Sequence, residues 1–141
     1  MNERGVLTSF LVCKIGVAFA GLAFLGVILS IHASIGRLAE REELAQVADA
    51  IAGAIKEIDF LPSKAEMWRS LPVTSQRLEV VVIGERSSGI QVIRVNIIAD
   101  GEVERVLMLT NQVNGGDFTL TIKNPSIIHL TKAGTIQLEL I

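Results

Sequence analysis

The stretch "KIGVAFAGLAFLGVILSIH", from Lys14 to His32, decides what kind of protein this chain can be. No acidic or basic residue interrupts it between these two ends. In hydrocarbon every backbone N–H and C=O must be hydrogen-bonded within the segment, so a helix is the economical way to cross a membrane once. About twenty residues span a bilayer core, and residues 15–34 supply that length. We therefore predict a hydrophobic helix over residues 6–35 that can span a membrane.

The same stretch is rich in small residues, which make the predicted helix narrow. Gly16 and Ala20 stand four positions apart, the spacing at which small residues let a second helix approach closely. Gly21 and Gly26 are two further glycines along the segment. We take Gly16, Ala20, Gly21 and Gly26 as candidate helix-packing residues, against the alternative that small residues are simply common in membrane helices.

A cleaved secretory signal peptide is the main alternative for this segment. Such a peptide has an apolar region of about 7–15 residues followed by a small-residue cleavage site. The apolar run here is longer, and "SIHAS" at residues 30–34 and its surroundings offers only a poor site. The sequence therefore favours a retained helix.

Residues 36–60 continue the helix in amphipathic form. No proline occurs before Pro62, so one helix can run from about Leu7 to Asp59. Its apolar residues recur at steps of three and four, as on one face of a helix; they are Leu38, Leu44, Val47, Ile51, Ala54, Ile55 and Ile58. Pro62 and Pro72 disfavour helical angles in the residues before them. We predict a linker over residues 61–77 with one helical turn, in which Trp68 packs over the following domain.

Residues 78–141 change to the alternation of β-strands. Runs rich in β-branched residues are separated by turn sequences, of which Asp100-Gly101 is the strongest hairpin signal and Asn114-Gly115-Gly116 is a second. We expect about six antiparallel strands in a small sheet or sandwich, with the apolar stripe of the helix covering one sheet face. The predicted fold class is α+β, with a long N-terminal helix followed by a small antiparallel β domain.

Composition argues against several functions. The net charge of −2, the five Phe, the single Trp and the absence of Tyr do not suggest a nucleic-acid partner. A single cysteine, Cys13, cannot form an internal disulfide. The two histidines, His32 and His129, stand in no metal-ligating or catalytic motif, and no phosphate-loop or nucleophile pattern is present. We expect no enzymatic activity, no cofactor and no metal site.

The layout resembles the type IV pilin-like family, which includes archaeal pilins, archaellins and pseudopilins. The short charged leader "MNERG" at residues 1–5 precedes the hydrophobic helix, the amphipathic helix and the β domain. The resemblance implies a class III signal peptide that a prepilin peptidase cuts after Gly5, with Arg4 before the cut and Val6 as the new N-terminus. It also implies that residues 6–35 pack with copies of the chain, or with related subunits, in the core of a cell-surface filament, with the β domain outside.

Two positions depart from the family pattern. Many members carry a glutamate as the fifth residue after the cut, where this chain has Phe10. Archaeal members often lack that glutamate, so the departure favours an archaeal member. Lys14 within the apolar portion is also unusual and would need a partner or a place at the membrane surface. The alternative function keeps the architecture without the filament: an uncleaved, single-span anchor whose extracytoplasmic β domain acts in assembly or envelope attachment, like archaellum accessory proteins.

Overall fold

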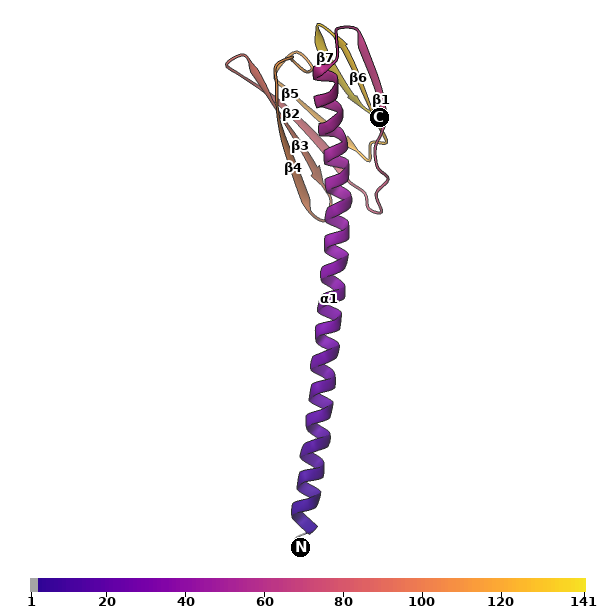
Figure 1. The fold of residues 1–141 in the computed structure, drawn as a ribbon, viewed down its shortest axis with the longest axis vertical. Coiled ribbons are helices and arrows are strands. Elements are labelled where there is room, and N and C mark those ends of the chain that lie inside the picture. Colours follow the sequence, from indigo (N-terminus) through magenta and orange to yellow (C-terminus); the bar gives the residue numbers. More distant parts are fainter. Residues whose placement is uncertain (1–2) are drawn as a thin grey trace. The chain divides into compact units, whose positions relative to one another are not determined.

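The computed structural model describes residues 3–141, with side chains from Thr8 onward. The chain divides into two compact units between Leu38 and Ala39, and each is described by itself. The first unit is helical throughout its described part. The second contains the remainder of the same helix, α1 (Glu3–Phe60), and all the described strands (Figure 1). This order of elements confirms the predicted α+β class.

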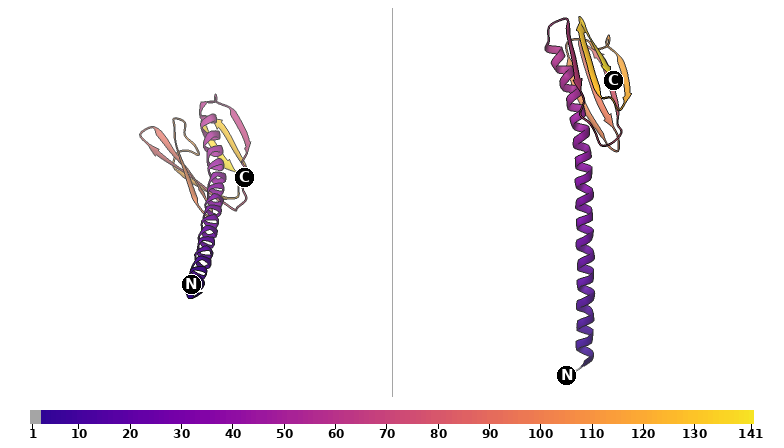
Figure 2. Two further views of the ribbon diagram at one scale, coloured as in Figure 1. Left: turned by 60° about the horizontal axis from the view of Figure 1, so that its bottom comes forward. Right: turned by 90° about the vertical axis from the view of Figure 1, so that its right-hand side faces the viewer.

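The strands form two antiparallel sheets, which Figures 1 and 2 show from three directions. The three-stranded sheet has the order β1-β6-β7, with β1 at Ala65–Ser70, β6 at Ile127–Ala133 and β7 at Thr135–Leu140. The four-stranded sheet has the order β4-β3-β2-β5, with β2 at Glu79–Ser87, β3 at Ile90–Ile98, β4 at Glu102–Leu109 and β5 at Phe118–Lys123. The six strands expected after Leu78 are therefore present as β2–β7.

Strand alternation decides which face of each sheet is buried, because successive side chains point to opposite faces. In β3, Ile93, Val95 and Ile97 are fully buried, whereas Arg94 between them is exposed. Their partners across the antiparallel register are themselves apolar; Ile93 pairs with Leu107 and Ile97 with Val103. The faces predicted from the sequence for these two strands are confirmed.

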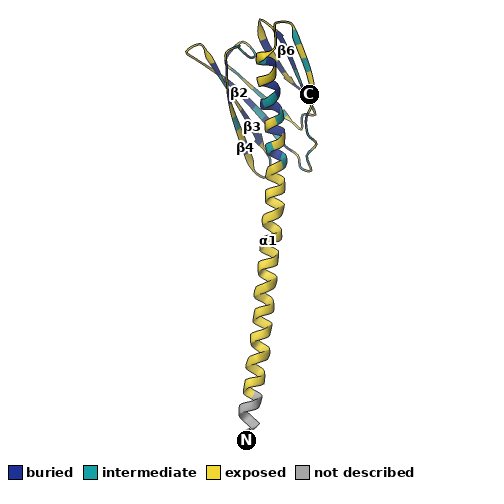
Figure 3. Ribbon diagram, in the orientation of Figure 1, coloured by how far each residue is buried: buried dark blue, intermediate teal, exposed yellow. Residues whose placement is uncertain are grey.

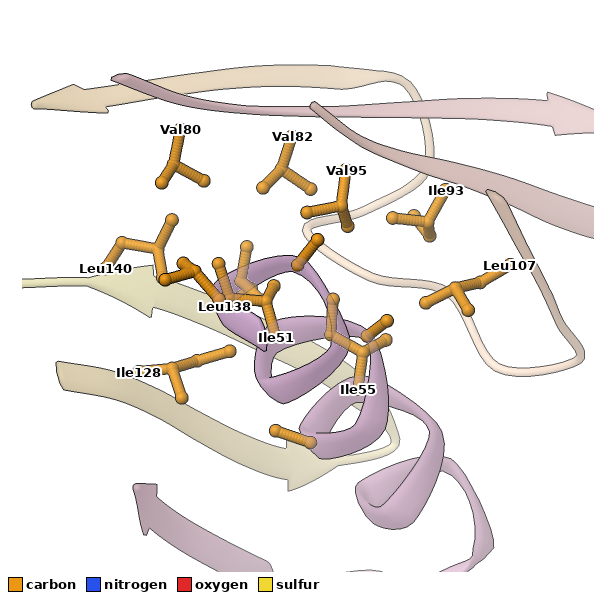
Figure 4. Packing of buried hydrophobic residues seen from close by; sticks show 14 of the residues in the cluster. Ile51, Ile55, Val80, Val82, Ile93, Val95, Leu107, Ile128, Leu138 and Leu140 are labelled. Atoms are coloured by element: carbon orange, nitrogen blue, oxygen red, sulfur yellow. The ribbon is translucent and has the colours of Figure 1, made fainter. Parts of the chain in front are cut away.

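The core of the second unit lies between the helix and both sheets. Figure 4 shows Ile51 and Ile55 of α1 between residues of the four-stranded sheet, such as Val82, and residues of the three-stranded sheet, such as Leu138. The predicted apolar stripe is buried from Leu44 to Ile58. Leu38, the first residue predicted for that stripe, is 68% exposed and belongs to the first unit. The helix thus covers two sheet faces where the sequence predicted one.

The end of α1 is held by a buried lysine from the three-stranded sheet. The last carbonyls of a helix lack intrahelical donors. The Nζ of Lys132, which is 7% exposed, donates to the carbonyl oxygens of Asp59 at 2.7 Å and of Leu61 at 2.6 Å. The side chain of Asn111 donates to Oδ1 of Asp59 at 2.7 Å. These bonds satisfy polar groups at the helix terminus that have no intrahelical partner, and they attach the terminus to the β domain. Pro62 prevents the helix from continuing.

The turns follow the local chemistry of the chain. Ser88 and Gly89 both have positive φ, 47° and 85°, at the β2–β3 connection, as the tight turns favoured in hairpins require. The hairpin predicted at Asp100-Gly101 is confirmed between β3 and β4, where the Ala99 N–H donates to the Gly101 carbonyl at 2.8 Å. The turn predicted at Asn114–Gly116 is also present, with positive φ at all three residues.

The edge of β7 is covered by the turn that carries Asn114. The Asn114 N–H donates to the carbonyl of Ile136, and the Ile136 N–H donates to the carbonyl of Gln112. The Asn114 side chain continues the pattern, because its Oδ1 accepts the Leu138 N–H at 2.8 Å. Buried Gln91 holds the same turn from β3, with its Oε1 accepting the Val113 N–H at 2.6 Å. A sheet edge that would otherwise be open is therefore satisfied.

The prediction of an irregular linker with one helical turn over residues 61–77 is wrong in its centre. Ala65–Ser70 form β1, which pairs antiparallel with β6 from Ala65 opposite Lys132 to Ser70 opposite Ile127. The two prolines flank this strand and do not interrupt it, so they exclude helix without excluding strand. The pairing partner, β6, lies near the C-terminal end of the sequence, and no local pattern in residues 61–77 predicted the pairing.

Candidate functional site

The first candidate site is the apolar part of α1, which none of the described residues covers. Every described side chain from Thr8 to Glu42 is exposed (Figure 3). Among the large apolar ones, Phe19 and Leu29 are each 69% exposed and Leu22 is 66% exposed. Soluble monomers rarely show contiguous apolar patches beyond a few hundred Å². An exposed apolar surface of this extent is typical of a segment that contacts lipid or another protein.

Length and composition agree with a membrane environment. Among the described residues, one helix is long and apolar enough to cross a membrane, and its most apolar part is not buried within the protein. A signal sequence near an N-terminus would meet the same criterion. The hydroxyl of Ser34, within the span, donates to the Ser30 carbonyl at 2.9 Å, which satisfies it without water.

Among the described residues, nothing packs against the three candidate glycines. A Cβ placed on Gly16, Gly21 or Gly26 would meet no atom within 4 Å. Glycine inside a helix is less favourable than alanine by about 1 kcal/mol, and no contact within the chain offsets that cost. Ala20 likewise lies on the exposed segment. The space that these residues leave free is available to another helix.

Helix geometry divides the four candidate packing residues between different faces. At about 100° per residue, Gly16 and Ala20 lie about 40° apart and share one face. By the same rotation of about 100° per residue, Gly21 lies about 140° from Gly16 and Gly26 lies about 80° from it on the other side. The structure therefore brings together Gly16 and Ala20 only. A single partner helix cannot contact all four residues.

Lys14, the cation inside the apolar segment, has a partner one turn earlier. Its Nζ lies 4.7 Å from the centroid of the Phe10 ring, a cation–π contact at the i, i+4 spacing. Phe10 occupies the position where the resembled family often has a glutamate. In this chain the residue at that position is aromatic and not a carboxylate, and its ring contacts the ammonium group of Lys14 on the same helix.

The predicted cleavage position, residues 4–6, lies at the N-terminal end of α1. Arg4, Gly5 and Val6 are helical in α1, but their side chains lie outside the described part of the protein. Met1 and Asn2 of the predicted leader lie outside the described residues altogether.

The polar face of α1 in the second unit is tied to the β domain by exposed ion pairs and hydrogen bonds. Asp49 pairs with Arg105 of β4 at 2.7 Å, and Glu57 pairs with Arg69 of β1. Oε2 of Glu43 accepts the N–H of Ser75 at 2.9 Å and its hydroxyl at 2.8 Å. Hydrogen bonding to Ser75 lowers the pKa of the Glu43 carboxyl, the backbone donor having the largest effect. Such exposed pairs each contribute little free energy.

The second candidate site is an aromatic and titratable cluster on the outer face of the three-stranded sheet. The indole of Trp68, from β1, stacks on the imidazole of His129, from β6, with ring centroids 3.8 Å apart and an interplanar angle of 15°. The Trp68 Nε1 donates to Oε1 of Glu66 at 3.0 Å. The same Glu66 oxygen lies 3.0 Å from Nε2 of His129, and Glu139 of β7 lies 3.2 Å from Nδ1. The cluster thus joins all three strands.

This cluster corrects the prediction for Trp68. We expected a residue that packs over the β domain, but the side chain lies on the solvent face and is 57% exposed. The core is filled instead from the other face of β1, where Met67 packs against the buried cluster. Strand alternation explains the outcome, since neighbouring residues of one strand cannot both point inward.

The electrostatics of the cluster favour a charged imidazole. The hydrogen bond to Glu139 raises the pKa of His129 most, desolvation opposes it, and the hydrogen bond to Glu66 raises it further. The pKa of Glu66 is lowered, first by the Trp68 hydrogen bond and then by His129. The side chain of His129 is 15% exposed, whereas Glu66 and Glu139 are 59% and 66% exposed.

A cavity of about 350 Å³ lies at the loop between β1 and β2. Its walls are mainly residues 71–78 and 124–126, with Val47 of the helix. The residue at the loop tip, Val73, is 97% exposed. Within residues 3–141, no three His, Cys, Asp or Glu side chains gather closely enough to hold a metal ion.

Comparison with known protein families, curated proteins and solved structures finds no match to this chain. What the molecule does must therefore be inferred from its own residues.

Sequence reasoning missed the Trp68–His129 cluster, although the sequence contains a hairpin signal for the pair His129 and Glu139. β6 and β7 form a hairpin that turns at Gly134, whose φ is 90°, and antiparallel pairing around that turn places His129 opposite Glu139. A hairpin register drawn from the "KAGT" turn would have paired these two residues. Glu66 and Trp68 gave no such signal, because β1 itself was not expected.

Proposed function

We propose that this chain is a pilin-like structural subunit. It is inserted in the cell membrane before assembly, with the β domain outside the cytoplasm. Its N-terminal helix then packs with copies of itself, or with related subunits, in a type IV pilus-like filament or a pseudopilus. The role is structural and not catalytic.

The observation that carries this proposal is the change of environment along α1. From Thr8 to Glu42 the helix is exposed on all sides, and from Leu44 to Ile58 it is buried on one face in its own domain. A subunit that moves from lipid into a helical core needs an apolar segment that its own domain leaves uncovered. The core of the second unit contains no residue before Leu44. A domain built in this way can keep its fold both in the membrane-inserted subunit and in the filament.

The glycines support packing in a bundle rather than in a simple pair. Gly16, Gly21 and Gly26 leave open space on different sides of the helix. A helix in the centre of a filament has several neighbours, and close approach on several sides uses such positions. The ammonium group of Lys14, which lies over the Phe10 ring, gives the segment one positive charge that a neighbouring subunit can contact.

The test is the mass of the protein isolated from its native cells, measured both in the membrane fraction and in filaments sheared from the cell surface. We expect a chain that begins at Val6 and that is recovered in the filaments. Replacing Gly5→Leu should leave an uncut chain in the membrane, whereas the nearby control Asn2→Ala should still be cut and assembled. A chain that keeps Met1 and never leaves the membrane would contradict the proposal and would identify the single-span anchor instead.

A further inference from the structure

Both ring nitrogens of His129 face carboxylate oxygens, which only a protonated imidazole can satisfy. Nδ1 lies 3.2 Å from Glu139 and Nε2 lies 3.0 Å from Glu66. A neutral imidazole has one N–H and one lone pair, so one nitrogen would present its lone pair to a carboxylate. The geometry of the cluster is therefore that of an imidazolium held between two anions.

The position of His129 in the sheet gives this proton a structural role. β6 is the central strand of the three-stranded sheet, and His129 pairs with Trp68 of β1 on one side and with Glu139 of β7 on the other. β1 lies at the edge of its sheet and has β6 as its strand neighbour. On the outer face, the contacts of β1 with His129 are the Trp68 stack and the Glu66 hydrogen bond.

The lysine and arginine cations of β1 and β6 have partners other than the two carboxylates at the ring. Lys132, on the same strand, points to the opposite face, where it donates to Asp59 and Leu61. Arg69 of β1 pairs with Glu57 of the helix. The charged groups that shift the pKa of His129 are Glu139 and Glu66, and both raise it.

We propose that His129 is a proton-dependent switch that holds the edge strand β1 on the three-stranded sheet. When the imidazole loses its proton, one ring nitrogen presents a lone pair to its carboxylate, and the positive charge that strengthens the hydrogen bond to Glu66 disappears. The outer-face attachment of β1 therefore weakens. Because the pKa of His129 is raised in the folded protein, its contribution is fully present below the unfolded pKa and is lost as the pH rises through the folded one. The edge of β1 and the indole of Trp68 are therefore more mobile on the alkaline side of this titration.

The first experiment follows the proton directly. The chain has one tryptophan and two histidines, so the full-length protein in detergent micelles gives simple spectra. An imidazolium stacked on an indole quenches its fluorescence, so Trp68 emission should increase as the pH rises through the His129 titration observed by NMR. His129→Gln should abolish this step, and the control His32→Gln should preserve it. A His129 pKa at or below its ordinary value would overturn the proposal.

The second experiment follows the strand. Hydrogen exchange of β1 amides should lose protection relative to those of β3, a central strand of the other sheet, as the pH passes the His129 titration. Glu139→Gln should move that change to lower pH, whereas the exposed control Glu102→Gln should not. A constant ratio of β1 to β3 protection while His129 titrates normally would show that the proton has no effect on the strand, and the proposal would be wrong.

Discussion

The two portions of α1, residues 8–38 and residues 39–60, have the same secondary structure but differ in what surrounds them. In the first portion every side chain is exposed although most are apolar. In the second portion the apolar side chains from Leu44 to Ile58 are buried or partly buried, and Asp49 and Glu57 pair with arginines of the β domain. Helical secondary structure alone therefore does not decide whether an apolar side chain contributes to the stability of the protein. What matters is whether the chain itself supplies the surface that the apolar side chains need.

This difference has a consequence for mutation. Substitutions in residues 39–60 should change the stability of the β domain, and substitutions in residues 8–38 should change only membrane insertion or association. Pairs of identical substitutions, one in each portion, separate the two effects.

The largest effect is expected for Ile55→Ala. Ile55 is fully buried between the helix and the sheets, and removal of such a side chain lowers the free energy of unfolding by about 2–5 kcal/mol. The matched change Ile28→Ala, at a residue that is 46% exposed, should alter it by less than about 0.5 kcal/mol. Urea unfolding of the full chain in micelles, followed by Trp68 fluorescence, measures both. Equal effects at the two positions would contradict the division.

The next effect concerns insertion. Leu25 lies near the middle of residues 15–34, and arginine at the centre of a span costs about 2.5–3.5 kcal/mol on insertion scales. We expect Leu25→Arg to leave a large fraction of the protein extractable from membranes by alkaline carbonate. Leu38→Arg, the same substitution beyond the apolar segment at a residue that is 68% exposed, should remain in the membrane. Full membrane retention of Leu25→Arg would mean that this segment does not cross the bilayer.

A buried cation gives the third prediction. Lys132→Met leaves the carbonyls of Asp59 and Leu61 without their donor, and hydrogen bonds from a charged group contribute about 1.5–3 kcal/mol. The free energy of unfolding should fall by that amount, with faster hydrogen exchange in the last turn of the helix. Lys123→Met, at an exposed residue of β5, serves as the control. If the two variants were equally stable, the lysine would not hold the end of the helix.

The smallest effect is expected at the helix-packing face. Gly16→Leu combined with Ala20→Leu fills the open space on one side of the first portion. Self-association in lipid, measured by energy transfer between labelled chains, should weaken by about tenfold, which corresponds to about 1.4 kcal/mol. The stability of the β domain should not change. The control Ala18→Leu lies on the opposite side of the helix, about 200° from Gly16 at about 100° per residue, and should leave association intact. A double variant that associates normally would exclude Gly16 and Ala20 as the contact.

The features that sequence predicted well are those with a local period. Alternation placed Ile93, Val95 and Ile97 on the buried face of their strand, and helical spacing identified the stripe from Leu44 to Ile58. The turn at Asp100-Gly101 also follows from neighbouring residues alone. Each of these patterns is set within a few residues of the chain.

The features that sequence missed depend on distant partners. β1 becomes a strand because β6, some sixty residues later, offers it an edge, and Trp68 faces solvent for the same reason. The Lys132 contact with the helix end likewise joins residues from opposite ends of the domain. The apolar segment has no covering contact among residues 8–141, so its sequence pattern predicts an apolar environment without specifying the molecules in it.

The most direct measurement is therefore the state of the purified full-length protein after detergent is removed. If residues 8–38 need a cover from outside the chain, the protein should float with liposomes when lipid is supplied. Without lipid, analytical ultracentrifugation should detect assemblies and essentially no monomer. A protein that sediments as a stable monomer in aqueous buffer, with or without liposomes, would contradict the central claim.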